Sequence, residues 1–113
     1  MSVIMALRLE GDAKKFEEFA AANPDRMVGI RNKAVERGVI AHRFFGSLDG
    51  STIIVVDEWP DPESFQAFFE ETGEEIQSMM GEAGFNPGGQ PQPEFWRVLE
   101  SQDKYGWEAG PAG

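Results

Sequence analysis

The sequence predicts an α+β domain whose elements follow in the order strand, helix, strand, strand, helix, strand. Two apolar segments rich in β-branched residues flank Asp49-Gly50, a pair typical of a tight hairpin. Asn23-Pro24 and Asp61-Pro62 each combine a helix-capping residue with a proline suited to the first helical position. Because these two pairs stand on either side of the hairpin, two helical regions alternate with the strands.

The first helical region follows a strand that is expected over residues 3–9. Asp12 is expected to cap a helix whose buried positions include Phe16 and Phe19. Asn23 is expected to cap a restarted helix after a bend, and Gly38 to end it.

The second helical region begins at Asp61 and has an apolar stripe typical of a buried helix face. Thr72 and Glu75 have the spacing of a fresh capping box, which predicts that this region comes in two pieces. A loop rich in proline and glycine is expected over residues 84–93. The remaining strands are predicted over residues 39–47, 51–59 and 94–99.

This element order is that of the ferredoxin-like β-α-β-β-α-β domain, a four-stranded antiparallel sheet with its helices on one face. Residues 1–99 are expected to form this domain, and residues 100–113 a flexible C-terminal tail. Tyr105 and Trp107 leave an alternative open, in which the tail folds over the pocket or over a partner subunit.

Both faces of the predicted sheet are apolar. Large apolar residues occupy both alternating positions of the strands over residues 39–47 and 51–59, for example Ile53 and Ile54. The helices cover one face, and a second subunit is the simplest cover for the other. The sequence therefore predicts a homodimer.

The composition narrows the class of protein further. Twenty acidic residues against ten basic ones give a net charge of −10, which disfavours nucleic acid as a partner. The chain has no cysteine, so a disulfide framework and a thiolate metal site are excluded. No apolar segment approaches the length that spans a bilayer, and the first residues lack the pattern of a signal peptide. The expected location is cytoplasmic, without a membrane partner.

Two segments resemble a known family. Residues 38–44, GVIAHRF, and residues 55–65, VVDEWPDPESF, together with the element order, resemble the dimeric α/β-barrel superfamily. The resemblance is greatest to its antibiotic-biosynthesis-monooxygenase-like branch, in which strand three ends in an acidic residue and a tryptophan before a helix start. It covers residues 1–99 and implies a dimeric α/β barrel.

The resemblance also implies candidate functions. Members include cofactor-free monooxygenases acting on aromatic polyketides, haem-degrading enzymes and proteins without a known reaction. Trp59 matches the strand-three tryptophan of several catalytic members, and no cofactor is expected. The haem-degrading members use a histidine on the second helix and an asparagine in strand one. Residues 61–83, which correspond to that helix, contain no histidine, and residues 3–9, which correspond to that strand, contain no asparagine. The oxygenases use an asparagine near the strand-three tryptophan, and residues 51–59 contain none.

One constellation is a candidate site. A two-residue turn at Asp49-Gly50 would place His42 opposite Asp57 on one face of the sheet. A carboxylate that fixes the imidazole tautomer makes His42 a candidate general base, which could deprotonate a phenol and make it reactive toward dioxygen. The aromatic wall for a flat ligand is expected from Trp59, Phe44 and Trp96.

Two alternatives to this site remain open. His42 and Asp57 are also explained as a satisfied buried pair, with Trp59 as core. A metal site at His42, Asp57 and Glu94 has ligands of suitable type but no motif that gathers them. Arg43 and Glu58 are expected to form a structural pair across the sheet. Three functions therefore remain open. The protein is a cofactor-independent oxygenase, a non-catalytic module that binds a ligand or is associated with stress, or a structural dimer.

Overall fold

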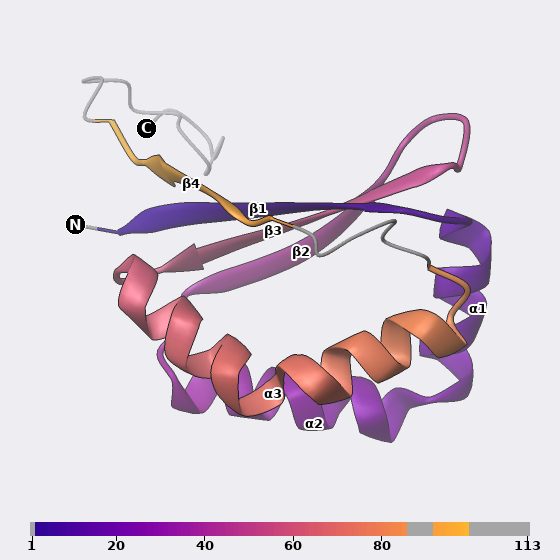
Figure 1. Ribbon diagram of the computed structural model, residues 1–113, viewed down its shortest axis with the longest axis horizontal. Helices are drawn as coiled ribbons and strands as arrows, with labels where there is room; N and C mark the ends of the chain where they lie inside the picture. Colours follow the sequence, from indigo (N-terminus) through magenta and orange to yellow (C-terminus); the bar gives the residue numbers. More distant parts are fainter. Residues whose placement is uncertain (1, 86–91, 100–113) are drawn as a thin grey trace, which may run out of the picture.

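A single antiparallel sheet and three helices make up the fold in the computed structural model, which describes residues 2–85 and 92–99. The strand order β2-β3-β1-β4 is the one that the predicted β-α-β-β-α-β topology requires. All helices lie on one face of the sheet, as Figure 1 shows. The strands are β1 (Val3–Glu10), β2 (Ala41–Gly46), β3 (Thr52–Trp59) and β4 (Glu94–Arg97), and the helices are α1 (Ala13–Ala22), α2 (Pro24–Glu36) and α3 (Pro62–Glu82).

The predicted fold class is confirmed, with small differences at the element ends. The strands β2 and β4 are shorter than the sequence patterns indicated, and the expected tail lies outside the described residues. Within the described residues, no helix is both long and apolar enough to cross a bilayer.

The two N-terminal helices begin where their capping residues indicated, but only one cap uses its side chain. The Asp12 carboxylate accepts hydrogen bonds from the backbone N–H groups of Lys14 and Lys15. Asn23 stands at the N-cap of α2 without a side-chain cap bond, because its amide donates instead to the carbonyl of Phe19. Asn23 thus ties the start of α2 to the last turn of α1.

The β2–β3 hairpin has the predicted register but a wider turn. His42 pairs with Asp57 as expected, whereas the turn is closed by a hydrogen bond from Gly50 N–H to the Ser47 carbonyl. Asp49 accepts hydrogen bonds from the Ser51 hydroxyl and backbone N–H and from the Ser47 hydroxyl. These bonds lower the pKa of the Asp49 carboxyl to about 2, and the bond from the Ser51 hydroxyl has the largest effect. The wider turn is still centred between Asp49 and Gly50, so the facing residues and the face of every side chain stay as predicted.

The prediction that the second helical region comes in two pieces is wrong, because α3 is one continuous helix. The Thr72 hydroxyl does not cap a new helix; it donates to the carbonyl of Phe68, one turn earlier in the same helix. Bonds of this kind bend helices, and α3 changes direction along its length in Figure 1. Asp61 caps its start by accepting from the Ser64 N–H.

Helices α2 and α3 run antiparallel and are joined by three ion pairs on their exposed sides, here called the α2–α3 ion pairs. Arg26 binds Glu82 through both guanidinium nitrogens, at 3.1 and 2.7 Å, and thereby lowers the pKa of the Glu82 carboxyl. The other two pairs are Lys33 with Glu75, at 3.3 Å, and Arg37 with Glu71.

The core lies between the sheet and the helices and is rich in aromatic rings. Trp59 is completely buried and contacts the rings of Phe65 and Phe68, with centroid distances of 5.8 and 5.4 Å. Met5 and Thr72 are the other large side chains without appreciable exposure. Because these residues come from β1, β3 and α3, the centre of the core lies between the middle of the sheet and the third helix.

Candidate functional site

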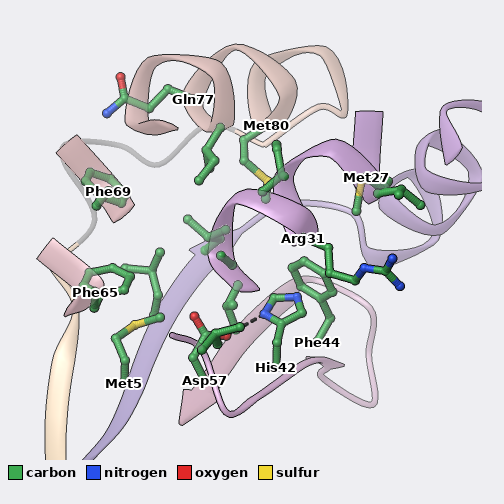
Figure 2. Close-up of a pocket in the computed structure, with 18 residues that line it drawn as sticks. Met5, Met27, Arg31, His42, Phe44, Asp57, Phe65, Phe69, Gln77 and Met80 are labelled. Atoms are coloured by element: carbon green, nitrogen blue, oxygen red, sulfur yellow. Dashed lines mark hydrogen bonds and ion pairs between the residues drawn. The ribbon is translucent and has the colours of Figure 1, made fainter. Parts of the chain in front are cut away.

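A cavity of about 480 Å³ separates the sheet from α2 and α3. Its wall consists mainly of aliphatic, methionine and phenylalanine side chains, several of which are labelled in Figure 2. The polar residues that line it are Arg31, His42, Asp57 and Gln77. A largely apolar cavity with a few polar groups, of this volume, is typical of sites for small organic molecules.

His42 and Asp57 meet at the floor of this cavity, because their strands pair at this position. His42 Nδ1 lies 2.5 Å from Asp57 Oδ1, a contact marked by the dashed line in Figure 2. The second oxygen, Asp57 Oδ2, accepts a hydrogen bond of 3.2 Å from the indole Nε1 of Trp59. Both oxygens of this buried carboxylate are therefore bound, as a buried charged group requires.

This arrangement orients the imidazole for proton transfer. In the tautomer in which Nδ1–H donates a hydrogen bond to the Asp57 carboxylate, the neutral ring carries its lone pair at Nε2, on the side away from Asp57. The Phe44 ring stands edge-on to the imidazole, with ring centroids 4.6 Å apart. The His42 side chain is 40% exposed whereas that of Asp57 is 6% exposed, so the histidine is the accessible member of the pair.

The aromatic residues proposed for the ligand wall have three different environments. Phe44 lines the cavity beside His42. Trp59 lies behind Asp57 in the core and does not line the cavity. Trp96 is 58% exposed and pairs with Ile4, whose side chain points to the opposite face of the sheet. The expectation that Trp96 belongs to the same wall is therefore wrong, because alternate residues of a strand face opposite sides.

Two further sequence-based expectations are corrected by the topology. Glu94 lies in β4, beyond β3 and β1 from His42, and it pairs with Ala6 on the other face of the sheet. It therefore cannot join His42 and Asp57 around one ion, and no three metal-ligating side chains gather within residues 2–85 and 92–99. The expected pair of Arg43 with Glu58 is also not formed. Glu58 accepts from the Ser2 hydroxyl, and Arg43 lies over the Phe45 ring.

Two polar residues of the cavity were missed by the sequence analysis. Arg31 follows Ile30 on α2 and lies one helical turn from Met27, another lining residue. Gln77 follows Ile76 on α3 and lies one helical turn from Met80, which also lines the cavity. Their spacing from apolar positions could have indicated that both stand at the border of the inner helix face. Of the methionines on the helices, Met27 and Met80 line the cavity, whereas Met79 is buried and does not.

The comparisons with known proteins bear on the fold. No protein-family model matches the sequence, and no curated protein sequence matches it. Among solved structures, a cofactor-independent oxygenase from Streptomyces nogalater, SnoaB, has a TM-score of 0.59 and 13% identity, covering 88% of this chain and 95% of that one. A dimeric ferredoxin-like protein from an uncultured marine organism has a TM-score of 0.62 and 13% identity, covering 88% and 89%.

A third similar structure contains a ligand. It is a monooxygenase from the ActVA-Orf6 gene of Streptomyces coelicolor in complex with nanaomycin D, with a TM-score of 0.55 and 17% identity, covering 88% of this chain and 91% of that one. At such identities the likeness establishes the fold alone. It confirms the ferredoxin-like fold that the sequence resemblance implied, a fold that an oxygenase, a monooxygenase and a dimeric ferredoxin-like protein share.

Proposed function

We propose that the cavity binds a flat, largely apolar phenolic compound of aromatic or polyketide-like type, and that the protein oxygenates it without a cofactor. The observation that supports this most directly is the His42–Asp57 pair on the floor of an open apolar cavity. The fold shared with SnoaB and the Streptomyces coelicolor monooxygenase supports it as an analogy.

In this proposal His42 is the general base. Its Nε2 takes the proton of a phenol or of an acidic CH2 group between phenolic rings, and Asp57 stabilises the resulting imidazolium. The electron-rich anion then reacts with dioxygen. One oxygen atom becomes the new carbonyl of the substrate and the other leaves as water, so the substrate itself supplies all the electrons. The apolar wall excludes bulk water from the reacting anion.

A non-catalytic ligand-binding or stress-associated role is the alternative. It is favoured by the cavity lining, which contains no asparagine among the described residues, although the resembling oxygenases use one near the tryptophan. The same cavity would then bind the compound without changing it. The two roles differ in whether dioxygen is consumed when the ligand is bound.

Oxygen uptake in the presence of a dihydroxyanthrone tests the catalytic role. We expect the protein to accelerate dioxygen consumption and formation of the corresponding anthraquinone, followed by its absorbance. Binding of the anthrone, detected by native mass spectrometry, without accelerated oxygen uptake would instead support the ligand-binding alternative. A protein that neither binds nor oxidises flat phenols would contradict both roles.

We further propose that the protein is a homodimer joined through the face of the sheet that the described helices leave open. This face carries apolar side chains from several strands, since Ile54, Phe45 and Trp96 are 39%, 43% and 58% exposed. An apolar sheet face of this kind is a typical interface. One similar solved structure is described as a dimeric ferredoxin-like protein, which supports the proposal by analogy.

Sedimentation at micromolar concentration tests the homodimer. We expect a dimer for the native protein and a monomer for Trp96→Glu, because the substitution would bury a charge at the interface. The matched control is Val35→Glu, which adds the same charge at an exposed apolar position of α2. A native protein that sediments as a monomer would contradict the proposal.

A further inference from the structure

We infer that Arg31 is a specificity-determining residue of the cavity, and that it selects ligands carrying a carboxylate. The inference rests on the proposed function, because it names the substrate class of the same cavity. The compound would be a flat apolar phenol with its hydroxyl toward the sheet and its carboxylate toward α2.

Arg31 is the only Arg or Lys among the described residues that line the cavity. Its guanidinium makes one polar contact within the described ranges, a hydrogen bond of 3.3 Å to the side-chain oxygen of the adjacent Asn32. No carboxylate of residues 2–85 and 92–99 lies within ion-pair distance of it. The guanidinium therefore has several donors free to bind an anion.

The other cations of α2 and its C-cap contrast with Arg31. Each of them takes part in the α2–α3 ion pairs, on the exposed sides of the two helices. The chain has twice as many acidic as basic residues, with twenty against ten, so a partner for a surface arginine is readily available. Arg31 instead borders an apolar cavity, and no ion pair within the described residues accounts for a positive charge at this position.

The two ends of the cavity differ in charge and in exposure. The floor holds Asp57, whose two oxygens are already bound by His42 and Trp59, so it does not compete for the Arg31 guanidinium. Arg31 comes from α2 and is exposed to solvent, and in Figure 2 its guanidinium points away from the centre of the cavity. A ligand with its hydroxyl near His42 and an anionic group directed outward past α2 would therefore meet the Arg31 guanidinium.

A matched pair of ligands tests this inference. The probes are a hydroxynaphthoate and the corresponding hydroxynaphthamide, which have the same flat ring system and differ in charge. We expect the native protein to bind the carboxylate more tightly, on the order of ten-fold, as one charge-assisted contact at a partly exposed site supplies. In Arg31→Gln, calorimetry should show this preference lost while the affinity for the amide stays the same. Added salt should reduce the preference in the native protein.

Lys14→Gln is the control, because it removes one positive charge from an exposed position of α1 that does not line the cavity. It should keep the preference for the carboxylate. If Arg31→Gln keeps that preference, or if the native protein binds both probes equally, the inference about Arg31 is overturned while the cavity retains its proposed ligand class. If neither probe binds, the proposed function is overturned as well.

Discussion

Replacing His42 with Ala is expected to lower kcat for oxygenation by roughly 10²- to 10⁴-fold, the usual contribution of a general base. KM should change little, because the apolar wall that binds the ring system is retained. Added imidazole should restore part of the lost rate, since a small base can enter the space that the side chain leaves. The measurement is oxygen uptake with a dihydroxyanthrone, with and without imidazole.

His42 is the only histidine of the chain, so its ring gives a single imidazole signal in nuclear magnetic resonance. We expect that signal to show the Nδ1–H tautomer, which the contact with Asp57 imposes. Arg43→Ala is the control, since it truncates the neighbouring residue on the opposite face of β2. Full turnover by His42→Ala would remove this residue from the mechanism.

The largest expected effect on stability is that of Trp59→Ala. Its side chain is completely buried between β3 and α3, and truncating a buried Trp costs about 3–5 kcal/mol of the free energy of unfolding. The substitution also leaves Asp57 Oδ2 without its indole donor. Urea unfolding at a fixed protein concentration measures the loss, because an oligomer would make the apparent stability depend on concentration.

Trp59→Phe separates the loss of apolar burial from the loss of the hydrogen bond to Asp57. It keeps most of the buried apolar surface and removes the hydrogen bond to Asp57, which is expected to cost about 1–3 kcal/mol. Trp96→Ala should cost less than Trp59→Ala, because Trp96 is 58% exposed in the single chain and contributes only through the proposed interface. Equal losses for Trp59→Ala and Trp96→Ala would show that burial in the core does not distinguish the two tryptophans.

Local signals predicted the parts of the fold that depend on neighbouring residues. The turn around Asp49 determined the pairing of His42 with Asp57, because a hairpin centred between Asp49 and Gly50 leaves only one set of facing residues. The position of Trp96 was not predictable in this way. Its strand follows a long connection, so nothing in the adjacent sequence sets its pairing with β1 or the face that each side chain takes.

The cavity could also not be predicted from the spacing of apolar residues. Apolar spacing on α2 and α3 indicates which residues face inward, but Phe69 and Met80 look the same whether they touch the sheet or stand away from it. The distance between sheet and helices depends on the shapes of many distant side chains. The break predicted at Thr72 failed for a related reason, since a threonine hydroxyl that can cap a helix can equally bond within one.

The α2–α3 ion pairs favour one alignment of the two helices that cover the cavity. Exposed pairs of this kind add little to the free energy of folding, with a median of about 0–1 kcal/mol each. Sliding α3 by one turn along α2, however, would place Arg26 against Ser78 and Arg37 against Ala67. Only the native alignment forms all three ion pairs at once, so these pairs disfavour packings in which one helix is shifted along the other. The alignment of the two helices above the cavity is thus favoured by charges on their outer surface, in residues that do not line it.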